Sequence, residues 1–195
     1  MDHQHKVGLK DDLSRLTRPP YSKPDPKDER LAKYKGNCFC GSVEFELFDD
    51  PLDASYCHCR DCQRLHGAPY QWAAIFHKTD MHFTKGQEDL IFYSVPTKAT
   101  EYVLPVKISC AVCHGPIADE GRRMMLVFPE LVQFDFNLLP GPFRATHHMF
   151  YGSRVEDVHD DIPKFLGKKG ECPFEGESKG PESIDKLTKW RTEHS

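Results

Sequence analysis

Short apolar segments recur through the middle of the chain, and several of them alternate with polar residues. In Val43–Leu47 the apolar residues occupy every second position, which is typical of a strand with one buried face. Similar patterns predict strands at residues 71–76, 90–94, 101–104, 106–109, 124–128 and 131–136. No long pattern with the 3.6-residue helical period occurs between residues 34 and 165. We therefore expect a mainly β fold, with antiparallel strands joined by long loops and few short helices.

The two ends of the chain differ from this central part. Residues 1–33 are rich in charge and proline, so we expect a flexible N-terminal tail. The alternative is one helical turn packed on the body through Leu9, Leu13 and Leu16. Residues 34–166 are expected to form the folded domain. Residues 167–195 are expected to form a C-terminal tail with a short helix from Pro181 to Trp190.

Charge and hydropathy narrow the classes of partner. A formal net charge of −4 gives no reason to expect nucleic acid or an anionic membrane. No apolar run approaches the roughly 20 residues of a membrane-spanning helix. Residues Met1–Lys10 are polar and show no signal peptide, so a cytoplasmic location is expected. In that reducing environment closely spaced cysteines are interpreted as metal ligands rather than disulfides.

Seven of the eight cysteines fall into three tight groups. Two groups, Cys38 with Cys40 and Cys110 with Cys113, together supply four thiolates. Structural zinc prefers four tetrahedral ligands of this kind. We expect these four cysteines to hold a structural zinc that closes a loop of about seventy residues.

The third group has a different character. Cys57, Cys59 and Cys62 supply three thiolates within six residues, and no fourth cysteine belongs to the group. Three protein ligands and an open position are typical of catalytic zinc, which suits a thiol substrate. The alternative is a closed structural site completed by a histidine, for which the candidates are His58, His66 and His114. Cys172 stands alone and is interpreted as a free surface thiol.

Four motifs, in this order, resemble the glutathione-dependent formaldehyde-activating enzyme family, which includes the centromere protein V relatives. Gly36–Val43 is similar to the opening C-x-C-G strand of the family, and Cys57–Arg64 with Gly67 to its C-H-C-x-x-C-Q-R-x-x-G motif. Cys110–Cys113 stands in the place of its late C-x-x-C, and Asp160–Phe165 is similar to its closing D-D-L-P-x-F.

The resemblance implies a fold and an activity. The implied fold is a β-tent of antiparallel sheets whose loops are tethered by zinc, with two Zn²⁺ per chain. The implied structural zinc is held by Cys38, Cys40, Cys110 and Cys113, and the implied catalytic zinc by Cys57, Cys59 and Cys62. The enzyme members condense glutathione with formaldehyde, formally a carbon–sulfur lyase reaction in reverse.

We therefore expect a lyase-type enzyme that acts on a glutathione-like thiol adduct of an aldehyde or another electrophile. Its partner would be this small-molecule substrate, with glutathione as co-substrate. His148 is the candidate acid/base group, and Arg64 the candidate fork for a substrate carboxylate. The alternative function is a non-catalytic zinc scaffold like the centromere protein V relatives. A chaperone or nucleotide-exchange factor is a third reading, and it would need only the four-cysteine site.

Overall fold

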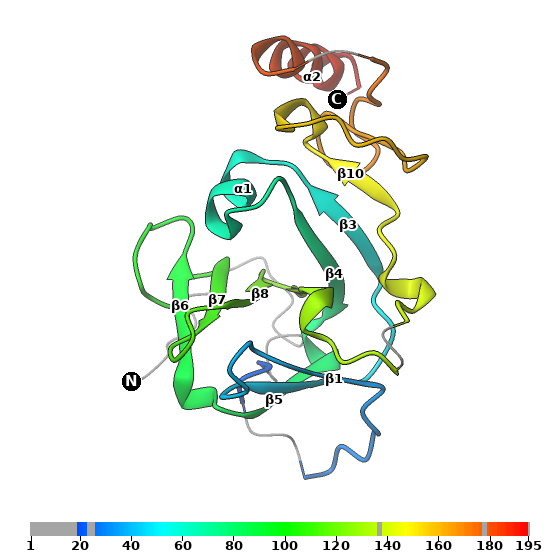
Figure 1. The fold of residues 1–195 in the computed structure, drawn as a ribbon. Helices are drawn as coiled ribbons and strands as arrows, with labels where there is room; N and C mark the ends of the chain where they lie inside the picture. The colour runs from blue at the N-terminus through cyan, green and yellow to red at the C-terminus, as the bar shows by residue number, and fades with distance from the viewer. Residues whose placement is uncertain (1–18, 23–25, 136–137, 177–178, 195) are drawn as a thin grey trace. The chain divides into compact units, whose positions relative to one another are not determined.

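The computed structural model describes residues 19–22, 26–135, 138–176 and 179–194, and its chain divides into two compact units. The first unit comprises the described parts of residues 1–52 and 74–143, and the second those of residues 53–73 and 144–195. Strands dominate the first unit, and the helices α1 (Arg60–His66) and α2 (Pro181–Glu193) belong to the second. The expected mainly β fold is confirmed (Figure 1).

A three-stranded antiparallel sheet, in the order β1-β2-β5, forms one part of the first unit. Its strands are β1 (Tyr34–Asn37), β2 (Glu44–Leu47) and β5 (Met81–Lys85). Gly36 lies opposite Phe45, and a Cβ atom at Gly36 would come within 2.3 Å of the Phe45 ring. Glycine at this position therefore lets Phe45 pack across β1 into the core.

The second sheet of the first unit is also antiparallel (Figure 1). The order of its strands is the end of β4 (Gln71–His77), then β9 (Met124–Val127), β8 (Pro116–Glu120), β7 (Val106–Cys110) and β6 (Leu90–Ser94). Alternate residues of β7 and β9 are buried, including Ile108 and Val127. Short 3-10 turns join the strands: η2 (Lys78–Asp80), η3 (Gln87–Asp89), η4 (Pro129–Leu131) and η6 (Gly141–Phe143).

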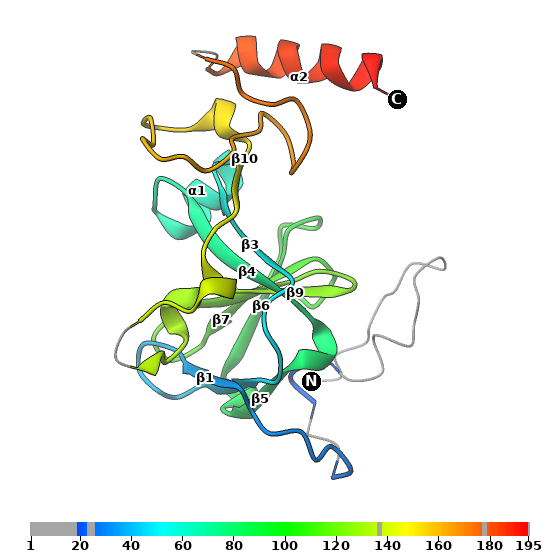
Figure 2. The same cartoon turned by 90° about the vertical axis from the view of Figure 1, so that its right-hand side faces the viewer.

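The second unit is built around β3 (Asp53–Cys57), which β10 (His147–Met149) joins in parallel. Figure 2 shows the two strands, cyan and yellow, running side by side although about ninety residues separate them. His148 lies opposite Tyr56, and Met149 lies opposite Cys57. The turn η7 (Tyr151–Ser153) then packs against α2.

Two of the predicted strands are wrong. Residues 101–104 are not a strand, because Tyr102 turns its ring into the core against Tyr21 and Phe92. In the described part of residues 131–136 the chain leaves η4 and makes only an isolated bridge, from Val132 to Gly36. Tyr102, Leu104 and Val132 are nevertheless buried, although the segments that carry them are loops.

Some elements gave no recognisable signal in the sequence. The strands β1, β3, β5 and β8 were not expected, because glycine, serine or charged residues interrupt their apolar pattern. The helix α1 has seven residues, too few for a helical period to stand out.

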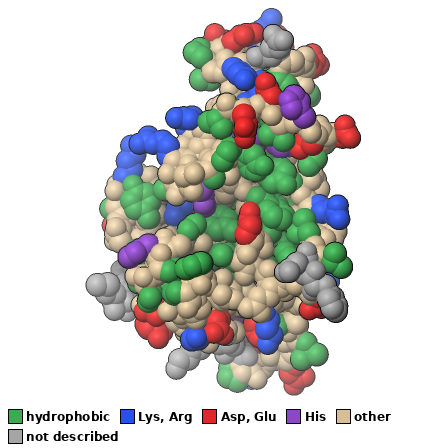
Figure 3. Space-filling view, in the orientation of Figure 1, with side chains coloured by type: hydrophobic (Ala, Val, Ile, Leu, Met, Phe, Trp, Pro, Cys, Tyr) green, Lys and Arg blue, Asp and Glu red, His purple; other side chains and the backbone are tan. Residues whose placement is uncertain are grey.

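Residues before β1 contact the first unit where they are described. The backbone N–H of Phe83 donates to the Pro20 carbonyl, and the Tyr21 ring packs edge-on against two aromatic rings. The alternative helical turn at Leu9, Leu13 and Leu16 lies outside the described residues. Neither α1 nor α2 is long and apolar enough to cross a membrane, and no other described helix is either. On the face drawn in Figure 3, acidic and basic side chains form small separate groups.

A buried ion pair lies inside the first unit. The Nζ atom of Lys78 is 2.6 Å from a carboxylate oxygen of Glu120, and both side chains are 0% exposed. The hydroxyl of Tyr102 donates to the same carboxylate at 2.7 Å. Burial raises the pKa of Glu120, and the positive charge of Lys78 opposes that shift. The ionised form of Glu120 is therefore stabilised in the core by Lys78 and Tyr102.

Lys78→Met is expected to lower the free energy of unfolding by about 3–5 kcal/mol, because it leaves Glu120 buried without its cation. Urea unfolding followed by circular dichroism measures the change. Lys85→Met is the matched control, since it removes the partner of Glu44 from an exposed ion pair and is expected to cost much less. Equal losses in the two variants would contradict this account of the core.

Candidate metal centres

Four cysteines meet in the first unit. Cys38 and Cys40 lie in the turn between β1 and β2, and Cys110 ends β7 just before the turn that holds Cys113. All four sulfur atoms lie within 4.8 Å of one another. The Cys38 and Cys40 sulfurs are 3.6 Å apart, and those of Cys40 and Cys110 are 3.8 Å apart.

These separations fit a tetrahedral zinc ion, whose Zn–S bonds of about 2.3 Å place sulfur ligands roughly 3.8 Å apart. The backbone also prepares the sulfurs for negative charge. The N–H of Val43 donates to the Cys38 sulfur at 3.3 Å, and the N–H of Val112 donates to the Cys110 sulfur at 3.4 Å. A contact with the Ser42 side chain lowers the pKa of Cys40 to about 6. The donor set therefore suits zinc.

Three cysteines meet in the second unit. Cys57 ends β3, Cys59 is the N-cap of α1, and Cys62 lies in the first turn of that helix. Their sulfur atoms lie within 4.8 Å of one another. The N–H of Cys62 donates to the Cys59 sulfur at 3.4 Å. This bond caps the N-terminus of α1, so the helix begins directly after Cys59.

The three thiols share negative charge unequally. Hydrogen bonds from Cys57 and Cys62 lower the pKa of Cys59, and the contact with Cys59 raises the pKa of Cys57. The same contacts raise the pKa of Cys62. These contacts therefore favour the thiolate form of Cys59, and a bound cation would favour ionisation of all three. All three cysteines are partly exposed, so the cluster is open to solvent.

Histidine does not join the three cysteines among the described residues. The ring of His58 points to His148 instead, with 2.8 Å between Nε2 of His58 and Nδ1 of His148. His114 lies in the first unit beside Cys113, with an exposed side chain and a backbone φ of +57°. Cys172 lies in the second unit, outside both clusters, with its sulfur near the Lys186 carbonyl.

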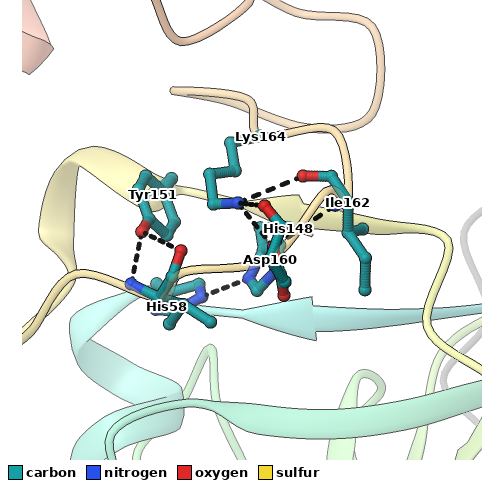
Figure 4. Close-up of polar contacts among 7 residues, drawn as sticks. His58, His148, Tyr151, Asp160, Ile162 and Lys164 are labelled. Carbon is teal, nitrogen blue, oxygen red and sulfur yellow. Dashed lines mark hydrogen bonds and ion pairs between the residues drawn. The ribbon is translucent and has the colours of Figure 1, made fainter. Parts of the chain in front are cut away.

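Arg64 and His148 occupy contrasting places in the second unit. Arg64 is exposed on α1, the helix that carries Cys62. His148 is 0% exposed, and both of its ring nitrogens have partners, His58 and Asp160 (Figure 4). Because His148 is paired with Tyr56 in register, its side chain lies on the Tyr56 face of the sheet, and that of Cys57 lies on the other.

Gln63 and Asp160 also contribute to this site, and neither was among the predicted site residues. Gln63 is buried and donates from Nε2 to the carbonyls of His58 and Ser153, both at 2.8 Å. It therefore ties the cysteine loop to η7. Asp160 holds His148 at 2.9 Å. The motif around Asp160 was visible in the sequence, but its partner was not.

A family model described as "Glutathione-dependent formaldehyde-activating enzyme" matches residues 33–152. Among solved structures, a crystal structure of a Rhodobacter sphaeroides protein is similar, with 25% sequence identity and a TM-score of 0.42. That likeness covers 54% of this chain and 91% of the other. No curated protein matches.

Protein purified without chelators is expected to carry two zinc ions per chain by elemental analysis. Cys110→Ser and Cys62→Ser are each expected to lower the zinc content by about one ion, because each removes a ligand from a different cluster. Cys172→Ser is the matched control and should keep the wild-type content. Two ions per chain in either cluster variant would contradict the assignment.

Proposed function

We propose, since the chain belongs to the glutathione-dependent formaldehyde-activating enzyme family, that it is a zinc-dependent carbon–sulfur lyase-type enzyme. Its substrate would be the adduct of a glutathione-like thiol with an aldehyde or another electrophile. The observation that carries the proposal is the partly exposed cluster of Cys57, Cys59 and Cys62, to which no fourth cysteine or histidine of the described residues adds a ligand. A site with three protein ligands leaves a position for substrate.

The reaction balances without an oxidant or reductant. In the direction of condensation, the substrate sulfur forms a bond to the aldehyde carbon, and the thiol proton ends on the former carbonyl oxygen. In the reverse direction the carbon–sulfur bond breaks and the thiol is released. A zinc ion held by Cys57, Cys59 and Cys62 would supply positive charge that favours the thiolate form of a substrate thiol. The role of the three cysteines is to hold that charge at the solvent-accessible edge of the second unit.

The four-cysteine cluster has a separate role in the proposal. With four thiols of its own it needs no substrate ligand, so Cys38, Cys40, Cys110 and Cys113 would hold a structural zinc. The turn between β1 and β2 would thereby be tied to the turn after β7. Two Zn²⁺ per chain follow from the two clusters together.

Arg64 is proposed to bind a substrate carboxylate. Its exposed guanidinium stands on α1, two residues after Cys62, and glutathione carries two carboxylates. A planar guanidinium meets a carboxylate with two parallel hydrogen bonds. The neighbouring Arg60 is less suited, because it already donates to Gln63 at 2.6 Å.

The second candidate function is a zinc scaffold that binds a partner protein. It is favoured by two exposed apolar side chains in the cysteine turns of the first unit. Phe39, between Cys38 and Cys40, is 91% exposed, and Val112, between Cys110 and Cys113, is 56% exposed. Exposed apolar groups of this size are common at protein contacts. The three-cysteine cluster favours the enzyme, because a scaffold has no use for an open metal site. The proposed partner is accordingly a small molecule rather than nucleic acid or a membrane, and a cytoplasmic location remains a prediction.

Cys59→Ser is expected to reduce the rate of adduct formation to the uncatalysed rate while the fold survives, because it removes one ligand of the open site and leaves the four-cysteine cluster intact. The assay is proton exchange NMR of glutathione with formaldehyde, which reports the rate of adduct formation, with circular dichroism for the fold. Cys172→Ser should retain wild-type activity. If the wild-type protein leaves the uncatalysed rate unchanged with a panel of aldehydes, the scaffold reading replaces the enzyme.

Arg64→Met is expected to raise KM for glutathione by about tenfold or more with a smaller change in kcat, because a lost charge-assisted hydrogen bond costs about 1.5–3 kcal/mol. Steady-state rates at varied thiol concentration provide the measurement. Cysteamine, which has no carboxylate, is the matched substrate control and should respond little to the substitution. A similar KM change for both thiols would exclude the carboxylate contact.

A further inference from the structure

A hydrogen-bonded network of side chains runs through the second unit, from the buried His58 of the cysteine loop to the exposed Asp160 after β10. Nε2 of His58 lies 2.8 Å from Nδ1 of His148, and Nε2 of His148 lies 2.9 Å from Oδ2 of Asp160. The other oxygen of Asp160 meets Nζ of Lys164 at 2.5 Å. Figure 4 shows the four side chains in this order. Both histidines are almost fully buried.

The protons of this network have one consistent arrangement. Burial opposes ionisation of Asp160, but the hydrogen bonds from Lys164 and His148 prevail and lower its pKa, so the carboxylate only accepts. His148 must then carry its proton on Nε2, and its Nδ1 becomes an acceptor. His58 in turn donates from Nε2 to His148. The carboxylate therefore sets the tautomer and ring orientation of both histidines.

His58 stands between two of the three clustered cysteines, and it is fixed at both backbone and side chain. Its N–H donates to the Met149 carbonyl at 2.9 Å, and its own carbonyl accepts from Gln63. The ring is enclosed by aromatic rings, with the centroids of Tyr70 and Tyr151 each 5.0 Å away. Among the described residues its Nδ1 has no hydrogen-bond partner, so the bond to His148 is the polar anchor of the ring.

We infer that His58, His148 and Asp160 are positioning residues, which together hold the turn from Cys57 to Cys59 so that the three sulfurs are placed for a metal ion. The inference rests on the metal site of the proposed function. In this inference His148 orients the cysteine loop through its bond to His58, and it does not contact the substrate as an acid/base group would. Metal ligands tolerate displacements of only about 0.2 Å, so loss of this anchor weakens the site without removing a ligand.

Because Lys164 and His148 both donate to residue 160, the hydrogen-bonded network requires an acceptor atom on each side of that residue. Lys164 donates to one oxygen of Asp160 while His148 donates to the other. In Asp160→Asn the amide must turn its NH₂ group toward one of these two donors, so one contact becomes repulsive. Replacing Lys164 by glutamine supplies an acceptor for that NH₂ group. The amide oxygen of residue 160 then accepts from His148 again, and the original tautomers of His148 and His58 are restored.

The test measures metal affinity at each cluster rather than activity. Full-length protein stripped of metal is titrated with Co²⁺, whose thiolate charge-transfer and d–d bands report both clusters, and Zn²⁺ affinity is measured by competition with a chromophoric chelator. In Asp160→Asn the affinity of the three-cysteine cluster is expected to fall by up to about 10–100-fold, the loss seen when a group that hydrogen-bonds a metal ligand directly is removed. The four-cysteine cluster should keep its affinity. Asp160→Asn with Lys164→Gln should recover most of the loss.

Tyr151→Phe is the matched control. It removes a hydroxyl that hydrogen-bonds the backbone of Val158 in the same region, but it leaves the hydrogen-bonded network unchanged. Its three-cysteine cluster should bind metal like the wild type. If Asp160→Asn fails to fold, His58→Leu and His58→Gln repeat the comparison at the other end of the network. Glutamine retains a donor to His148 and should preserve affinity, whereas leucine should lose it.

The outcomes separate this inference from the proposed function. Wild-type affinity in Asp160→Asn, or no recovery in the double variant, overturns the positioning role. A wild-type protein that binds a single Co²⁺ ion overturns both. Two bound ions with the expected loss in Asp160→Asn, but no catalysis with any thiol and aldehyde, would leave the positioning role standing and remove the enzyme.

Discussion

Each unit brings together thiol groups whose sulfur atoms lie within 4.8 Å of one another, and such groups repel one another when ionised unless a cation lies among them. In the first unit the cluster ties the turn after β1 to the turn after β7, which are about seventy residues apart. In the second unit the cluster of Cys57, Cys59 and Cys62 ties the end of β3 to the first turn of α1. The contacts among these three cysteines lower the pKa of Cys59 and raise the pKa values of Cys57 and Cys62.

The two clusters differ in what surrounds them, and this difference supports separate roles. Four cysteines satisfy a tetrahedral ion by themselves, and backbone N–H groups already point at two of their sulfurs. The three-cysteine cluster instead depends on its neighbours for shape. Gln63 and Met149 bind the backbone of His58, and the buried pair with His148 fixes its side chain. In the proposed function this site stays open for substrate, so no fourth protein ligand would hold it together.

A carboxylate in each unit is paired with a cation and a neutral donor, fully buried at Glu120 and exposed at Asp160. Glu120 lies between Lys78 and Tyr102, and Asp160 lies between Lys164 and His148, so each carboxylate has a cation and a neutral donor. The buried pair of Lys78 and Glu120 contributes little net stability compared with apolar packing, but removing one partner is costly. The two sets of contacts favour a single arrangement of the elements that carry them. For Asp160 that arrangement includes β10 and, through His58, the cysteine loop.

The sequence alone determined the features that depend on local spacing. Alternating residues predicted β2, most of β4, β6, β7 and β9, and the spacing of Cys57, Cys59 and Cys62 predicted their cluster. The grouping of Cys38 with Cys110 was also predictable, because four thiols are the common set for zinc. Features that depend on contacts between distant residues became visible only in the tertiary structure. Tyr102 is buried from a loop by Tyr21 and Phe92, and His148 is turned away from Cys57 by its register with β3. Its partner Asp160 became visible only in the fold, because the sequence does not show which donor a carboxylate will meet after folding.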